Sequence, residues 1–233
     1  MVKFVKASEL KKLYSVLGHF YKLKLPNKKV YKCRSVLEII SKPNETKFLT
    51  TKNVNKPDSI FIMMNPGSSK PLEELDSIVK TVDIDKMDIS LVRAKPDTTQ
   101  YQVMRVMLVN NWAHVRILNL SDLRNAKSGN FYEEFQEIET NKHGGAHSLF
   151  SLRRTNELKL KLNRKVNAPI ILAWGVDDSL DPLIMQTKKI LNKQNDLHGL
   201  LKQGTTDKYY HPLPAIQHQK EKWVNDIISS LKE

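Results

Sequence analysis

Side chains that donate and accept hydrogen bonds follow four short apolar runs in this sequence. FIMMNPGSS (61–69) places Asn65 after its apolar residues, and HVRILNL (114–120) carries Asn119 near its end. APIILAW (168–174) is followed by a glycine, and the later loop TTDKYYHPLP (205–214) presents His211. In open α/β sheets, ligands bind in the loops beyond the carboxyl ends of the strands. The ends of these runs therefore predict a binding site, with a simple strand-closing turn at 65–67 as the competing interpretation.

The elements that must position these residues alternate along the chain. Apolar runs at 59–64, 114–120 and 168–174 have the pattern of buried strands, and 197–201 is a possible fourth. We also predict a strand over 30–40, with 46–50 as its possible partner. Helical spacing of apolar residues predicts a helix opened by Asp97 or Thr98 and further helices at 8–21, 130–139, 148–162, 178–193 and 218–233.

This alternation predicts the fold class. Short apolar strands separated by helices indicate an α/β three-layer sandwich with a central, mostly parallel four-stranded sheet. A chain of 233 residues is long enough for a real core. We expect a single domain over 1–233, with a basic helical N-terminal extension over 1–29.

The composition limits the classes of binding partner that we expect for this protein. The net charge of +13 and the isoelectric point near 9.6 favour polyanionic partners such as nucleic acid or an acidic protein surface. A basic surface that binds no polyanion is the alternative.

Cys33 is the single cysteine, so no intrachain disulfide can form. No run is long enough to cross a membrane, and the first residues lack the apolar core of a signal peptide. We expect a cytoplasmic monomer without a metal or cofactor, because no metal-ligand pattern or nucleotide fingerprint is present.

Four motifs in order carry a resemblance to known families. FIMMNPGSS, ILNLSDLRN (117–125), PIILAWG (169–175) and YYHPLP (209–214) resemble the conserved-domain family of unknown function numbered 1643. More distantly they are similar to the uracil-DNA glycosylase superfamily, over residues 58 to 215. The resemblance implies a uracil-DNA-glycosylase-like sheet and hydrolysis of an N-glycosidic bond after the nucleotide is flipped out of the stack.

The same resemblance implies roles for individual residues. Asn65 would position the attacking water, and His211 would donate a hydrogen bond to the departing base. Asn119 would read the base edge through its amide, with the remaining base contacts expected from Met63, Met64 and Tyr210. Contacts to phosphate or nucleic acid are expected from Gly67, Ser68, Ser69, Lys70 and Leu213. The run of basic residues on the helix predicted over 148–162, and not the resemblance, adds Arg153 and Arg154 to these contacts. For the basic helix that carries the two arginines, a solvated face is the alternative.

Departures from the family pattern indicate weak chemistry. Met63 replaces the glycine that opens the first motif, and Asn65 carries no negative charge to offset an oxocarbenium ion. Leu213 replaces a phosphate-binding serine. We therefore expect a degenerate glycosylase with weak or no base excision; an active glycosylase that removes uracil or a related damaged base is the alternative.

Two binding partners remain open. DNA or structured RNA would be held by the basic surface, with an affinity that falls with salt. An acidic, DNA-mimicking uracil-glycosylase inhibitor protein is the other. The acidic region at 73–89, directly after the first motif, would repel phosphates and slightly favours the protein partner.

Overall fold

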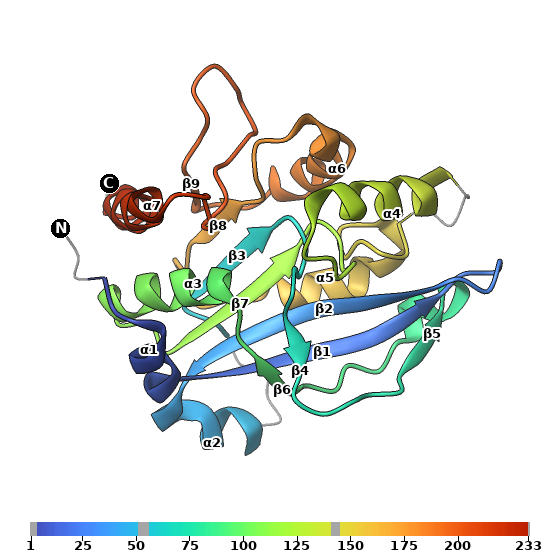
Figure 1. The fold of residues 1–233 in the computed structure, drawn as a ribbon, viewed down its shortest axis with the longest axis horizontal. Helices are drawn as coiled ribbons and strands as arrows, with labels where there is room; N and C mark the ends of the chain where they lie inside the picture. The colour runs from blue at the N-terminus through green and yellow to red at the C-terminus, as the bar shows by residue number, and fades with distance from the viewer. Residues whose placement is uncertain (1–3, 51–55, 141–144, 233) are drawn as a thin grey trace.

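A nine-stranded mixed sheet forms the centre of the molecule (Figure 1). The computed structural model describes residues 4–50, 56–140 and 145–232. Eight strands are joined in the order β4-β6-β1-β2-β7-β3-β8-β9, and β5 pairs with β1 outside this path. The sheet has a parallel half, from β7 to β9, and an antiparallel half, from β4 to β2.

The parallel half contains the strands predicted from apolar runs. These are β7 (His114–Asn119), β3 (Ser59–Met63), β8 (Ile170–Ala173) and β9 (Leu197–Gly199), each parallel to its neighbour. Met63 is in register with Asn119 on one side and with Ala173 on the other. The carboxyl ends of the three central strands therefore meet at one edge of the sheet, as the sequence predicts.

The antiparallel half is built on a long hairpin. β1 (Tyr14–Lys24) pairs with β2 (Val30–Ser41), and β2 joins the parallel half through β7. On its other side β1 pairs with β6 (Val92–Lys95), which carries β4 (Lys70–Pro71), and with the short β5 (Ile78–Lys80). The four-stranded, mostly parallel sheet predicted from sequence is thus wrong in strand number and in direction for this half.

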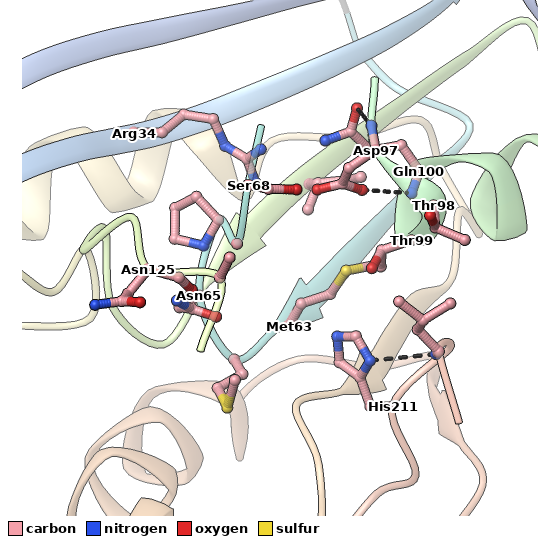
Figure 2. A pocket seen from close by; sticks show the side chains of 16 residues that line it. Arg34, Met63, Asn65, Ser68, Asp97, Thr98, Thr99, Gln100, Asn125 and His211 are labelled. Carbon is pink, nitrogen blue, oxygen red and sulfur yellow. Dashed lines mark hydrogen bonds between the residues drawn. The ribbon is translucent and has the colours of Figure 1, made fainter. Parts of the chain in front are cut away.

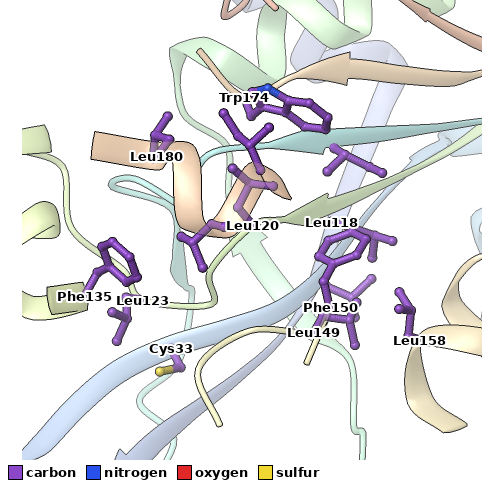
Figure 3. Packing of buried hydrophobic residues seen from close by; sticks show 14 of the residues in the cluster. Cys33, Leu118, Leu120, Leu123, Phe135, Leu149, Phe150, Leu158, Trp174 and Leu180 are labelled. Carbon is purple, nitrogen blue, oxygen red and sulfur yellow. The ribbon is translucent and has the colours of Figure 1, made fainter. Parts of the chain in front are cut away.

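Helices cover both faces of the sheet. One face packs against α4 (Ser128–Thr140), α5 (Thr155–Lys161) and α6 (Asp181–Leu191). Its core cluster includes Phe135 of α4 and Leu158 of α5 (Figure 3), together with Ile184 of α6. The other face packs against α1 (Ala7–Leu13), α3 (Thr98–Val109) and α7 (Gln217–Ser230). Among the described residues, the remaining helix is α2 (Lys42–Thr50), and there are three short 3₁₀ turns: η1 (Thr81–Lys86), η2 (Leu152–Arg154) and η3 (Asp178–Leu180). The α/β class with helices on both sides is confirmed.

The predicted helix over 8–21 is wrong beyond Leu13. Residues from Tyr14 onward form β1, whose first eight residues are all buried. When every residue of a segment is buried, its apolar residues also fall at helical spacing, so the spacing does not distinguish a helix from a strand. Backbone pairing with β2 and β6 makes this segment a strand. The predicted helical extension over 1–29 is helical only in α1 and is wrong from Tyr14 onward, because β1 is an inner strand of the sheet. Residues 1–3 lie outside the described part.

Of the other predicted helices and strands, some are confirmed and some are wrong. The helix opened by Asp97 is confirmed as α3, where Asp97 and Gln100 form a capping box. The predicted C-terminal helix is confirmed as α7, which buries Trp223 and Ile227. The possible strand at 46–50 is wrong, because these residues belong to α2, and the predicted helix over 148–162 begins only at the turn η2. No helix in the described ranges has the length and apolar character needed to cross a membrane.

Candidate ligand-binding site

A cavity of about 180 Å³ lies at the carboxyl ends of β3 and β7, against the first turn of α3 (Figure 2). The resemblance-based site residues that line it are Met63, Met64, Asn65, Gly67, Ser68, His211 and Leu213. Segments distant in sequence therefore meet here, as predicted from the strand ends. Arg34, Asp97, Thr98 and Thr99 also line the cavity and were not expected there.

Asn65 is held by the loop that follows β7. Its amide nitrogen donates to the carbonyl oxygens of Leu123 at 3.2 Å and Asn125 at 2.8 Å. Both amide hydrogens are used in these bonds, so only Oδ1 remains to meet a ligand. This geometry leaves Asn65 able to accept a hydrogen bond, for example from a water molecule.

Asn119 lies outside the cavity. Its side chain is completely buried, and it is not among the residues that line the space. With the amide oriented to suit its neighbours, it donates to the carbonyl oxygen of Asn65 at 3.1 Å and accepts from Nη2 of Arg34 at 3.2 Å. The expected contact between Asn119 and a base edge is therefore wrong for this conformation, because both ends of the amide are satisfied inside the protein.

Arg34 extends from β2 to the cavity wall (Figure 2). The residue is 2% exposed, and its Nε and Nη1 atoms have no hydrogen-bond partner. Burial lowers the pKa of Arg34 to about 10, although nearby Asp97 acts in the opposite direction. A guanidinium at this pKa stays charged at neutral pH, so the cavity wall contains a buried cation with unused donors.

Asp97 faces the same cavity from the start of α3. Its Oδ1 accepts from the backbone N–H of Gln100 at 3.1 Å, and its Oδ2 lies toward Gly67. Burial raises the pKa of Asp97, and Arg34 partly offsets the rise. No ion pair within 4.0 Å joins Asp97 to Arg34, although both side chains lie in the described part of the chain. The two groups influence each other across the cavity without touching.

His211 closes the opposite side of the cavity. Its Nδ1 accepts from the backbone N–H of Leu213 at 3.2 Å (Figure 2). Burial lowers the pKa of His211 to about 4, so the ring is neutral at pH 7. Because Nδ1 is the acceptor, the proton of the neutral ring sits on Nε2. His211 can therefore donate one hydrogen bond to a ligand, as the sequence analysis expects.

The turn after β3 brings the backbone close to the cavity. Gly67 has a φ of +60°, a conformation that disfavours residues with a side chain. Ser68 follows on the cavity wall, whereas Ser69 is fully buried and does not line the space. The expected phosphate contact is thus possible for Gly67 and Ser68, and Ser69 cannot make one through its side chain here.

A cationic groove of about 500 Å³ lies near the cavity, because Lys70 in the groove is two residues from Ser68 on the cavity wall. Its basic side chains are Lys22, Lys32, Lys70, Lys95 and Arg124, and the same groove also contains Glu73 and Glu74.

The basic residues of this groove differ in how they are held. Lys22 is paired with Asp76 at 2.9 Å, and Nε of Arg124 donates to the carbonyl oxygen of Ser69 at 2.7 Å. The predicted contact residue Lys70 is exposed at the rim, together with Lys32 and Lys95. The groove therefore combines fixed and free cations with a smaller number of acidic groups.

Three expected contact residues lie elsewhere. Arg154 is 1% exposed and is bonded to Asp122 and Glu157, so its expected contact with phosphate is wrong. Arg153 donates to the carbonyl oxygen of Thr81, and neither the cavity nor the groove includes it. Tyr210 is 46% exposed but does not line the cavity, so the expected base contact is absent in this conformation.

The sequence contains weak signals for two of the unexpected lining residues, Arg34 and Asp97. Arg34 interrupts an apolar strand, where a charged residue needs a partner or a purpose. Asp97 was recognised as a helix cap, and capping alone does not reveal a second role. Within residues 4–50, 56–140 and 145–232, no three His, Cys, Asp or Glu side chains are grouped as a metal site.

Comparisons with known proteins give no relative. No family model, no curated protein and no solved structure matches this chain.

Proposed function

We propose that this protein binds nucleic acid in the cationic groove, beside a glycosylase-like cavity that excises bases weakly or not at all. The observation that carries this proposal is the continuity of the two features. The segment that contains Gly67 and Ser68 on the cavity wall continues into Lys70 in the groove, and Lys95 in the groove precedes Asp97 in the cavity. A polyanion held in the groove would therefore lie close to the cavity.

The electrostatics of the groove support a nucleic-acid backbone as its ligand. Lys32, Lys70 and Lys95 are exposed along the groove, and no ion pair is found for them among the described residues. Lysines that neutralise phosphates release counterions, which supplies affinity without sequence preference. Glu73 and Glu74 limit this affinity because they repel phosphates. An acidic, DNA-mimicking inhibitor protein would meet the same lysines and is the competing partner.

The cavity argues against efficient base excision. Asn119, the expected reader of the base edge, is covered, and no Phe, Tyr or Trp side chain lines the space for stacking. Asn65 offers only an acceptor oxygen, which can orient a water molecule but cannot offset positive charge on a sugar. We infer that the parallel half of the sheet shares the uracil-DNA glycosylase arrangement while its site has lost most of the catalytic contacts.

Base excision is the second candidate because Asp97 brings a carboxylate into the cavity. A carboxylate is the group that Asn65 lacks, and it could stabilise an oxocarbenium-like transition state when ionised. His211 would then donate to the departing base through Nε2. The raised pKa of Asp97 weakens this candidate, since it favours the neutral acid.

Fluorescence anisotropy with a short labelled oligonucleotide tests the binding proposal. We expect affinity to fall linearly with salt on a double logarithmic scale, and each of Lys32→Gln, Lys70→Gln and Lys95→Gln to reduce the slope by about one. Lys189→Gln is the matched control, because it removes an exposed lysine on α6, outside the groove. Equal slopes for the groove variants and the control would refute binding in this groove.

An excision assay decides between the two candidates. Purified protein in excess is incubated with a single-stranded oligonucleotide that contains one uracil, followed by alkali, with an active glycosylase as the positive control. We expect little or no cleavage. Cleavage that is lost in Asp97→Asn and His211→Ala would establish excision instead.

A further inference from the structure

We propose that the cavity binds a terminal phosphate group, with Arg34 as its principal ligand. The inference rests on the proposed function, because the strand that ends in this phosphate would lie in the cationic groove. Strand ends and free nucleotides carry the same terminal phosphate chemistry, and the test below separates them.

The unsatisfied guanidinium of Arg34 is the first support. A buried charge without partners carries a large desolvation cost, which is offset only when hydrogen bonds and an opposite charge complete its surroundings. Arg34 makes one bond, to Asn119, and leaves Nε and Nη1 without partners. Of the other buried arginines, Arg116 and Arg154 pair with carboxylates, and Arg105 donates to the Val5 carbonyl and the Gln102 amide oxygen. Arg34 lines the cavity instead. An anion that enters the cavity would supply the missing acceptors.

The rest of the cavity wall adds donors around the same space. The first turn of the twelve-residue helix α3 lines it through Thr98 and Thr99, so the positive end of the helix dipole faces the ligand. Gly67 and Ser68 contribute a turn whose backbone comes close to the space, and His211 donates through Nε2. Hydroxyls, an imidazole N–H and a guanidinium are suitable partners for phosphate oxygens.

Asp97 is the opposing group. An ionised carboxylate would repel a phosphate. Burial raises the pKa of Asp97, and Arg34 partly offsets the rise. We therefore expect that loss of the acidic group at position 97 strengthens phosphate binding. This direction distinguishes a bound phosphate from a bound neutral base.

The shape of the cavity indicates an end rather than a continuous backbone. Its volume of about 180 Å³ is close to the roughly 150 Å³ that accommodates one benzene molecule. Its lining includes Met63 and Ile117, which are 3% and 1% exposed, and Asn119 is buried against Asn65. These buried residues form a part of the wall that a continuous strand would have to displace. Lys32 and Arg34 lie two positions apart on β2 and so share one face of the strand, which joins the groove to the cavity.

The experiment measures the affinity of one oligonucleotide with a 5′-phosphate, with a 3′-phosphate and with no terminal phosphate. We expect one phosphorylated end to bind about tenfold more tightly than the unphosphorylated strand, as one charged hydrogen-bond set would allow. Arg34→Met should remove this difference while the unphosphorylated strand binds as before. Asp97→Asn should increase it, and asparagine retains the helix cap. Far-UV circular dichroism and thermal unfolding check that each variant is folded.

The outcomes separate the two proposals. Equal affinity for all three strands would overturn the phosphate site and leave groove binding intact. Weaker phosphate preference in Asp97→Asn would also overturn it, because the acidic group would then contribute to binding the phosphorylated end instead of opposing it. A nucleoside monophosphate that binds in an Arg34-dependent way, while none of the strands binds, would support the phosphate site in the form of a free nucleotide and refute the groove.

Discussion

Arg34 and Arg154 occupy equally buried positions in two regions of the molecule, yet their surroundings differ completely. Arg154 bonds to Asp122 and to both oxygens of Glu157, and Asp122 also accepts from the hydroxyl of Tyr21. Burial alone would lower the pKa of Arg154, but these acidic neighbours raise it well above its usual value. Arg34 has no such neighbours in contact, and its pKa falls to about 10.

The difference separates a structural charge from one that is available to a ligand. The Arg154 network ties η2 to β1 and to the residues that follow β7, so every charge in it has an opposite charge in contact. Arg34 reaches the cavity with two unused donors and only an amide as a partner. Evolution of stability alone would favour an apolar residue at position 34. The position is therefore the better marker of function.

Breaking the Arg154 network should have the largest effect on stability. Arg154→Met leaves two carboxylates without their cation, and loss of one partner from a buried pair costs about 3–5 kcal/mol. We expect a loss of this size in the free energy of unfolding, measured by urea titration at neutral pH. A loss below about 1 kcal/mol would show that the network is not a stabilising unit.

Lower pH should destabilise the protein through its buried histidines. Burial lowers the pKa of His19 and of His211 to about 4, compared with about 6.5 in an unfolded chain. Between these values the unfolded chain binds more protons, so the free energy of unfolding decreases as the pH falls from 7 to 4, on the order of 3 kcal/mol for a fully buried group. His19→Gln should reduce this pH dependence in urea titrations at a series of pH values. An unchanged profile in that variant would contradict the assignment.

Replacing Arg34 should affect stability much less than replacing Arg154. Arg34→Met removes a buried cation with one hydrogen bond, and the relief of desolvation offsets the loss of the contact to Asn119. We expect a change within about 1 kcal/mol in either direction, measured under the same conditions as for Arg154→Met. Similar losses for the two variants would mean that Arg34 is structural and would weaken its assignment to ligand binding.

An exposed ion pair provides the lower limit of the comparison. Nζ of Lys222 lies 2.6 Å from Oδ2 of Asp226, one turn further along α7, and the lysine side chain is 70% exposed. Such pairs contribute about 0.3–0.5 kcal/mol. We expect Lys222→Gln to change the free energy of unfolding by no more than this, and less in high salt. A larger effect would show that α7 depends on this pair for its docking.

Sequence reasoning located the cavity better than it identified the side chains that define it. Asn65 and His211 were predicted at strand and loop ends and do meet there, because parallel strands align their carboxyl ends. Asn119 also follows an apolar run, but its side chain is completely buried and does not line the cavity. Arg34 went unrecognised because it reaches the cavity from β2, a strand outside the predicted four-stranded sheet.

Local pattern determined the buried strands β3, β7 and β8, and the start of α3. Continuous apolar runs and a capping box act within a few residues, so the sequence alone is sufficient for them. Only the tertiary structure decided that Tyr14–Lys24 is a strand, that Arg154 is paired and that Arg34 is not. The physical reason is that strand pairing and the partner of a buried charge depend on residues far away in the chain, whose positions no local period specifies.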